Sequence, residues 1–138
     1  MLIPSAHDLV AVLPEMVLVL GAGLLLLVEA ALPPVRRYAA EVTLLVIAGA
    51  AWSRLASDLP GPTWGGMLEV AAAAAGVDLY ILGATFLAAW MAGPFLRRNR
   101  ADHPELYALL LLAAVGAMVM ACAVDALPVF LGLELLSI

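Results

Sequence analysis

The sequence contains no lysine, a single cysteine and few charged side chains of any kind. Arginine supplies all six of the basic residues against eleven acidic ones, the formal net charge is −5, and charged residues make up 12% of the chain. Proteins that bind nucleic acid need a basic surface for the phosphates, so this balance argues against a nucleic-acid partner. The lone cysteine, Cys122, excludes an internal disulfide or a cysteine-rich metal centre. Its apolar neighbours predict a small buried packing residue.

Apolar side chains are what the sequence has in abundance. Hydrophobic residues account for 66% of the chain, whereas a soluble globular domain has roughly half. This composition predicts a membrane protein. The first ten residues, MLIPSAHDLV, include no lysine or arginine, so they lack the basic segment that opens a cleaved signal peptide. We therefore expect the first hydrophobic run to be retained as an anchor.

The apolar runs predict an all-α membrane protein with four complete transmembrane helices and a truncated fifth. A membrane-spanning helix needs roughly 20 mostly apolar residues. The expected helices cover residues 13–32, 38–55, 79–96, 104–124 and 126–138. The fifth run rises only about 20 Å, short of a hydrocarbon core of roughly 30 Å. We therefore expect residues 1–138 to form a single transmembrane helical region that is the N-terminal fragment of a longer subunit.

The segments between these runs predict caps and one longer connection. Residues 57–77 are rich in proline and glycine in their first half, and we expect an exposed connection there with a short strand or an interfacial turn. Asp78 and Asp125 are predicted N-caps, and Asp102 with Glu105 has the spacing of a capping box. Two stripes of small residues predict helix-packing surfaces. They are Thr85, Ala89 and Gly93 on the third helix, and Ala113, Ala117 and Ala121 on the fourth.

The arginines predict an orientation. Connections on the cytoplasmic side of a membrane carry an excess of basic residues. The first connection holds Arg36 and Arg37, the third holds Arg97, Arg98 and Arg100, and the second has only Arg54 at its edge. We therefore expect the first and third connections to face the cytoplasm and the N-terminus to face outward.

Glu134 is the candidate functional residue, because it stands alone in the apolar stretch LGLELL. It lies about nine residues into the fifth helix, or roughly 13 Å deep by helical rise. A charged side chain at such a depth costs about 2.5–3.5 kcal/mol on insertion scales, and residues of this kind mark ion and proton routes. The alternative is a neutral acid that forms an interhelical hydrogen bond and has no transport role. With no lysine in the chain and no arginine at that depth, a cationic partner would have to come from elsewhere.

Motifs for other chemistry are missing from the sequence. We find no hydrolase elbow, phosphate-binding loop, dinucleotide glycine fingerprint, or haem or iron–sulfur spacing. His7 and His103 lie outside the expected helices and lack a partner at metal-ligand spacing. The sequence therefore predicts no metal, no cofactor and no redox centre in this chain.

The C-terminal part carries a family resemblance. The pieces ELYALLL, VDALPVF and GLELLS within residues 104–138 resemble the fourth and fifth helices of the antiporter-like membrane subunits of complex I. Among these, the chain is most similar to subunit N of the bacterial NADH-quinone oxidoreductase. The stretch LPEMVLVLGAGLLLLVEA resembles the first helix of the same subunit. The region between is less similar, and its third helix has no lysine where relatives often carry a polar or basic residue.

The resemblance implies a function in respiratory proton translocation. The family has a proton-pathway glutamate in the middle of the fifth helix, and Glu134 is the matching position. The implied role is a membrane-arm subunit that couples quinone reduction to proton pumping, in a bacterial inner membrane and beside other membrane-arm subunits. NADH, FMN, iron–sulfur clusters and quinone would bind other subunits. The family's partner lysine on the seventh helix has no counterpart here, so the fragment alone is expected to be inactive.

Two other functions remain open on the sequence. The first is a cation–proton antiporter subunit of the same superfamily, which shares the glutamate. The second is a small assembly or scaffold membrane protein in which Glu134 is structural. A reading frame that continues past codon 138 into helices with intramembrane lysines would favour a transport subunit. A natural stop codon there, with stable expression of the short form, would favour the scaffold.

Overall fold

A computed structural model of the chain describes residues 6–31, 37–57, 61–70, 72–99 and 103–138. Its helices are α1 (Ala6–Ala11), α2 (Leu13–Ala31), α3 (Ala39–Ala56), α4 (Ala72–Arg98), α5 (Pro104–Cys122) and α6 (Ala126–Ser137). Among the described residues, α2, α3, α4 and α5 are long and apolar enough to cross a membrane, and α6 is a shorter apolar helix. The predicted all-α class, with four long apolar helices and a shorter one after them, is therefore confirmed.

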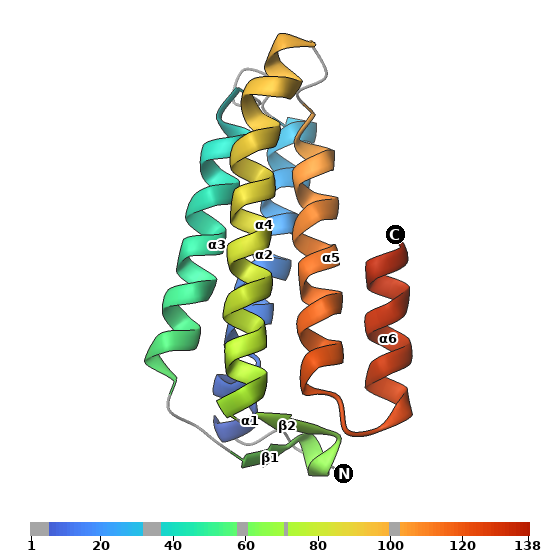
Figure 1. Cartoon of the computed structure of the whole chain (residues 1–138). Helices are drawn as coiled ribbons and strands as arrows, with labels where there is room; N and C mark the ends of the chain where they lie inside the picture. Colours follow the sequence, from blue (N-terminus) through green and yellow to red (C-terminus); the bar gives the residue numbers. More distant parts are fainter. Residues whose placement is uncertain (1–5, 32–36, 58–60, 71, 100–102) are drawn as a thin grey trace.

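The four long helices form an up-and-down bundle (Figure 1). The hairpin, α1 and the connection between α5 and α6 lie at one end, which we call the hairpin end. The opposite end is where α3 begins and α4 finishes, with Arg97 and Arg98 in the last turn of α4. Arg37 lies two residues before the first residue of α3, while Arg36 and Arg100 lie outside the described residues. The arginines of α4 and the approach to α3 thus share one end of the bundle.

Helix α4 is longer than expected. It begins at Ala72 and not at residue 79, because it takes in most of an alanine run that we had placed in the connection. Alanine has the highest intrinsic helix propensity, so the run extends the following helix. The N-cap prediction for Asp78 is therefore wrong, since this residue lies well inside α4. Asp125 does occupy the N-cap position of α6, although its side chain makes no capping hydrogen bond. Asp102 lies outside the described residues.

A two-stranded hairpin occupies the connection before α4. Strand β1 (Gly61–Thr63) pairs antiparallel with β2 (Leu68–Val70), with Pro62 opposite Glu69. The short helix η2 (Trp64–Gly66) joins them, and all three of its residues have positive φ, 53° at Trp64. The left-handed region is unfavourable for a residue with a side chain. The backbone N–H of Trp64 is held by a hydrogen bond of 2.8 Å to Asp8 Oδ1 in α1.

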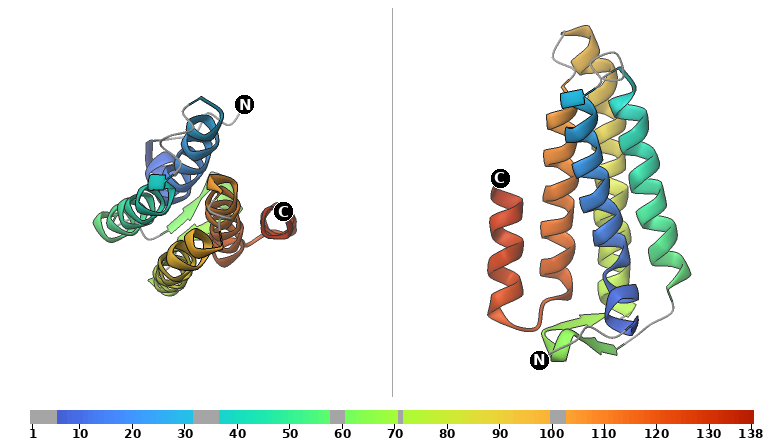
Figure 2. Two further views of the ribbon diagram at one scale, coloured as in Figure 1. Left: turned by 90° about the horizontal axis from the view of Figure 1, so that it is seen from above. Right: turned by 180° about the vertical axis from the view of Figure 1, so that it is seen from behind.

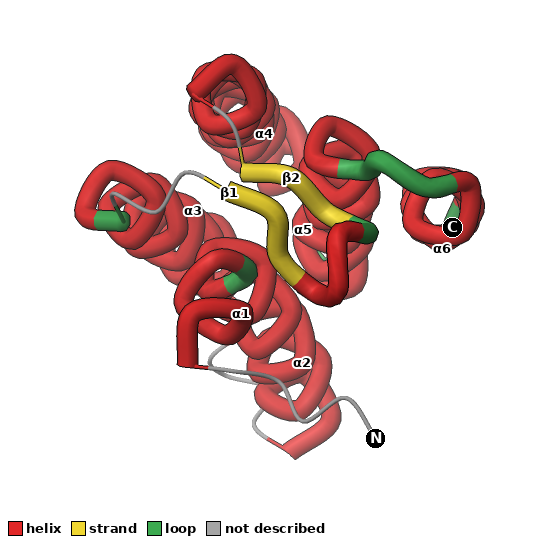
Figure 3. Tube along the Cα trace, turned by 90° about the horizontal axis from the view of Figure 1, so that it is seen from below, coloured by secondary structure: helices red, strands yellow, loops and turns green. Residues whose placement is uncertain are grey.

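The hairpin lies across the end of the bundle (Figure 3). Leu68 forms a β-bridge with Ala123, and the N–H of Val124 donates to the carbonyl of Met67 at 3.0 Å. Thr63 and Val70 are buried against the bundle. The expected short strand is therefore present, but it is anchored to the end of α5 and covers the interior.

The core of the bundle runs along its axis. Leu18, Ile47, Leu82, Leu111 and Met118 come from all four long helices and are at most 1% exposed. The small-residue stripe predicted on the third helix is buried at all three positions, as expected for a packing surface. The stripe predicted on the fourth helix is only half-buried. The closest contact of α5 with a neighbouring helix is made by another small residue, Gly116.

Helices α5 and α6 lie side by side (Figure 2), and two glycines make their closest contact. A Cβ atom on Gly116 would lie 2.6 Å from the carbonyl oxygen of Gly132 and 3.0 Å from Leu135 Cβ. A Cβ atom on Gly132 would clash with Met120 Cγ and would lie 2.7 Å from the carbonyl oxygen of Gly116. Small residues allow membrane helices to pack this closely. The close packing of α6 against α5 therefore depends on these two glycines.

We expect Gly116→Ala to weaken the α5–α6 contact, because the added methyl group meets backbone atoms that cannot move independently. Overpacking of this kind costs about 1–3 kcal/mol. The free energy of unfolding in mixed micelles, measured by denaturing-detergent titration, tests this. Gly23→Ala is the matched control, because a Cβ there meets nothing within 4 Å. Equal stability of the two variants would contradict the glycine contact.

The arginine distribution predicts that the hairpin end faces outward. In a Cys122→Ser background, Glu69→Cys on β2 should react with a membrane-impermeant maleimide in intact spheroplasts, because Glu69 is exposed at that end. Asn99→Cys, which is exposed at the end of α4, should react only after permeabilisation. The reverse labelling pattern would show the opposite orientation.

Candidate functional site

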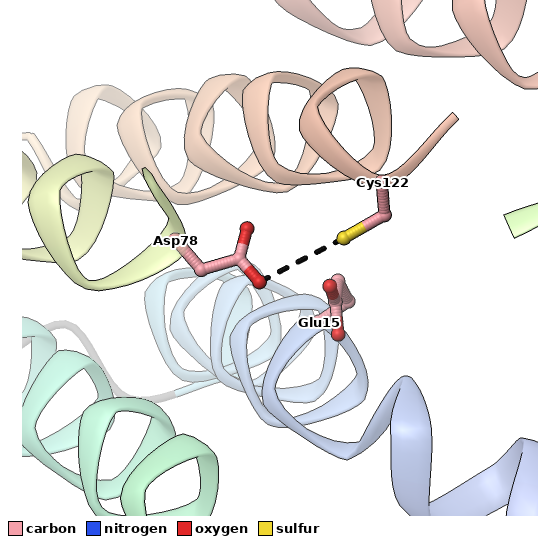
Figure 4. Close-up of side chains that lie close together, drawn as sticks. All are labelled: Glu15, Asp78 and Cys122. Carbon is pink, nitrogen blue, oxygen red and sulfur yellow. Dashed lines mark hydrogen bonds between the residues drawn. The ribbon is translucent and has the colours of Figure 1, made fainter. Parts of the chain in front are cut away.

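Four polar side chains meet inside the bundle at the hairpin end. They come from the beginning of α2, the end of α3, the early part of α4 and the end of α5. We call Glu15, Arg54, Asp78 and Cys122 the charge cluster, and their residues are 7%, 4%, 0% and 5% exposed. Figure 4 shows the two carboxyl groups and the thiol converging from three helices. The up-and-down topology brings these element ends together.

An ion pair between Arg54 and Asp78 lies at the centre of the charge cluster. Nη2 of Arg54 donates a hydrogen bond to Asp78 Oδ2, and the two side chains are 1% and 0% exposed. Nη1 of Arg54 donates to the carbonyl of Ala11 at 3.4 Å. The Cys122 thiol lies 3.8 Å from both Arg54 Nη2 and Asp78 Oδ2. The pair thus ties α3 to α4 and contacts α1 and α5.

The charge cluster holds more acid than base. Its two carboxyl groups face one guanidinium, so the three groups together would carry one negative charge if all were ionised. Within the described part of the chain, Glu15 Oε2, Asp78 Oδ1 and Arg54 Nε are buried without a hydrogen-bond partner. An uncompensated charge in a low-dielectric interior costs several kcal/mol or more. The arrangement therefore favours a further positive charge, such as a proton, at the carboxyl groups.

The charge cluster also contains possible metal ligands. One carboxylate oxygen from each of Glu15 and Asp78 and the sulfur of Cys122 all lie within 4.8 Å of one another. Carboxylate oxygen and thiolate sulfur both bind zinc. However, the guanidinium of Arg54 already contacts the ligand atoms of Asp78 and Cys122, so a divalent ion there would be repelled by a neighbouring cation. The geometry therefore favours proton and hydrogen-bond chemistry over metal binding.

An open cavity borders the charge cluster. It has a volume of about 270 Å³ and is lined by Glu69, Ala73, Ala74, Ala121, Cys122, Ala123 and Val124. Liquid water occupies about 30 Å³ per molecule, so the cavity has room for several waters. Cys122 belongs both to the lining of the cavity and to the charge cluster. The thiol thus marks the boundary between the buried charges and space that reaches the surface.

The structure places Glu134 elsewhere, on the exposed surface of α6. Pro128 and Gly132 are the buried residues of α6. At about 100° per residue, Glu134 points roughly 200° away from Gly132, on the face opposite α5. None of the described residues forms a hydrogen bond or an ion pair with it. The carboxylate therefore faces away from the bundle, among the exposed side chains of Phe130, Leu131 and Leu133.

Sequence reasoning missed the charge cluster. Asp78 was predicted to be an N-cap and Arg54 to lie at the edge of a connection. Glu15 lies near the start of an apolar run, where an acid is favoured by the helix dipole and does not by itself indicate a site. The structure also places His7 within α1, and not outside the helices as expected, and His103 just before α5. A usable signal did exist. In an up-and-down bundle, the start of the first helix, the end of the second, the start of the third and the end of the fourth lie at one end, and each carries one member.

The class of protein that the fold indicates is a helical bundle with four helices, among the described residues, that are long and apolar enough to cross a membrane. No family model matches the chain. NADH-quinone oxidoreductase subunit N of Trichlorobacter lovleyi is 32% identical over 95% of this chain and 27% of its own length. Subunit N of Gemmatimonas aurantiaca is 38% identical over 93% of the chain, and subunit N 2 of Rhizobium meliloti is 33% identical over 91% of it.

The chain is a homologue of the N-terminal part of NADH-quinone oxidoreductase subunit N. The alignments cover nearly all of the chain, and each of the three spans 27% of the relative's length. The chain thus spans about a quarter of the length of these curated relatives. The resemblance found in the sequence is confirmed.

We expect Arg54→Met to destabilise the bundle strongly, because it leaves two buried carboxyl groups without a cation. Removing one partner of a buried ion pair costs about 3–5 kcal/mol. Asp78→Asn in the same background should restore part of the loss, since it removes one of the acids. Denaturing-detergent titration of both variants gives the two free energies.

The matched control is Arg97→Met. Arg97 pairs with Glu41 at 2.6 Å, but these side chains are 47% and 51% exposed. Solvent-exposed pairs contribute about 0–1 kcal/mol, so this variant should remain close to wild-type stability. If Arg54→Met and Arg97→Met lowered the free energy of unfolding equally, the buried pair would be no more important for stability than the exposed one, which would contradict the prediction.

Proposed function

We propose that this chain is part of a proton-translocating membrane-arm subunit of a bacterial respiratory NADH:quinone oxidoreductase. Homology to subunit N over nearly the whole chain carries this proposal. The relatives named above are all subunits of NADH-quinone oxidoreductases, which favours this function over a cation–proton antiporter or a scaffold protein. The chain would lie in the bacterial inner membrane, with the hairpin end outward. NADH, flavin, iron–sulfur clusters and quinone would bind other subunits of the complex.

In this proposal, Glu134 is a group on the proton pathway. By the resemblance, it matches the position that the family uses for this purpose, and the other exposed side chains of its helix are apolar apart from Ser137 in the last turn. A carboxylate facing lipid at that depth would cost about 2.5–3.5 kcal/mol. The uncovered face of α6 is therefore proposed to pack against further membrane helices of the same complex. Those helices would supply the cation or the water that the described part of this chain does not place beside Glu134.

The proposed coupling is electrostatic. An acid shielded from water takes up a proton when nearby cations withdraw, and it releases the proton when they return. Quinone reduction elsewhere in the complex would move such charges along the membrane arm. Glu134 would respond by changing its proton occupancy, without forming any covalent intermediate. This role requires no redox group in the chain itself.

We expect Glu134→Gln to impair proton pumping and to leave insertion of the helices intact, since glutamine keeps the shape of the side chain but cannot exchange a proton. The change is introduced into the assembled NADH:quinone oxidoreductase that contains this chain. The measurement is the number of protons translocated per NADH oxidised in inverted membrane vesicles, with the amount of complex in the membrane as a second readout.

Glu105→Gln is the matched control, because Glu105 is an exposed acid in the first turn of α5. It should pump like the wild type. A Glu134→Gln complex that translocates the wild-type number of protons per NADH would rule out the proposed role of Glu134.

A further inference from the structure

The charge cluster contains an acid that the proposed role of Glu134 leaves unexplained. Glu15 is 7% exposed, and the groups facing it are Arg54 from α3, Asp78 from α4 and Cys122 from α5. The other neighbouring element, α1, gives the carbonyl of Ala11 to Arg54. Its acid, Asp8, binds the backbone of Trp64 in the hairpin. One cation therefore serves the two buried acids of the charge cluster.

The hydrogen bonds place that cation beside one of the acids. Arg54 Nη2 donates to Asp78 Oδ2, so the cation stabilises a negative charge on Asp78 more directly than one on Glu15. Glu15 Oε2 and Asp78 Oδ1 lack partners among the described residues. A carboxylate can only accept hydrogen bonds, whereas a carboxylic acid can also donate one. A single proton on Glu15 balances the charge of the cluster and supplies a donor close to Asp78.

The cavity at the hairpin end provides a route to this proton. Cys122 Sγ is within 4.8 Å of a carboxylate oxygen of Glu15. The same cysteine lines the cavity of about 270 Å³, together with the exposed acid Glu69. Water in that cavity therefore lies one side chain away from Glu15.

We propose that Glu15 is a proton-binding site, set against the Arg54–Asp78 ion pair and connected to water through the cavity at Cys122. On release, the O–H bond of Glu15 breaks and the proton passes to a water molecule of the cavity, which becomes hydronium. The electron pair stays on the Glu15 carboxylate, and Arg54 is then shared between the two acids. Uptake is the reverse. The site stands whether or not Glu134 takes part in translocation.

The test is infrared difference spectroscopy on the 138-residue chain in lipid nanodiscs. The wild type should show the C=O stretch of a buried carboxylic acid, which shifts in D₂O and titrates reversibly with buffer pH. Glu15→Gln should abolish this band. Glu41→Gln should leave it unchanged, because Glu41 is an exposed acid paired with Arg97. Circular dichroism checks that each variant keeps its helix content.

Asp78→Asn separates this proposal from a glutamic acid that is merely buried. With Asp78 neutral, Arg54 is free to pair with Glu15, so Glu15 should ionise and the band should disappear although Glu15 is still present. A band that persists in Asp78→Asn would overturn the proposal. The proposal would also be overturned if the wild-type spectrum and the Glu15→Gln spectrum were the same in the carboxylic-acid region.

A Cd²⁺ titration tests the metal alternative on the same sample. A thiolate-to-cadmium absorption band that forms at one ion per chain and is lost in Cys122→Ser would assign the charge cluster to a metal and overturn the proton site. A flat titration supports the proton. Neither measurement depends on pumping, so failure of the Glu134 proposal would leave these results unaffected.

Discussion

Burying the guanidinium of Arg54 constrains the whole hairpin end of this bundle. A charge in an apolar interior is tolerated only when it is paired and hydrogen-bonded. Asp78 supplies the opposite charge and Ala11 a carbonyl, so α4 and α1 must lie within reach of the last turn of α3. The hairpin lies across the same end and keeps this interior covered. The position of α1 follows in turn, because its Asp8 holds the strained backbone of Trp64.

Two glutamates illustrate two ways in which an apolar helix carries an acid. Glu15 lies inside the bundle, where the groups that neutralise it belong to this chain. Glu134 lies on the outer face of α6, where the described residues offer it no partner. Helix α6 itself is held against α5 by the contact of Gly116 with Gly132. The first acid can therefore be understood from this chain, whereas the proposed role of the second depends on the complex around it.

Much of the fold was predictable because a helix in a bilayer must satisfy its backbone hydrogen bonds internally and needs a minimum apolar length. Leu13 and Pro104 begin helices where the apolar runs predicted them. The beginning of α4 was predicted too late in the chain. The alanine run before it was assigned to the connection, although alanine has a high helix propensity. That error hid Asp78, which looked like a cap when it was placed at a helix end. The hairpin was foreseen as a short strand but not as the cover of a buried site.

The amino-acid sequence by itself determined the apolar helices, their order and which helix ends share a side of the bundle. Hydropathy is a local property, and successive helices joined by short connections alternate in direction. The sequence could not settle which side chains face inward. These helices are apolar on nearly all sides, so no polar face marks their outer surface. Packing decided that Arg54, Asp78 and Glu15 meet in the interior while Glu134 faces out. The reason is that the attraction between Arg54 and Asp78 arises only when α3 and α4 pack side by side, and the local sequence around either residue does not contain this contact.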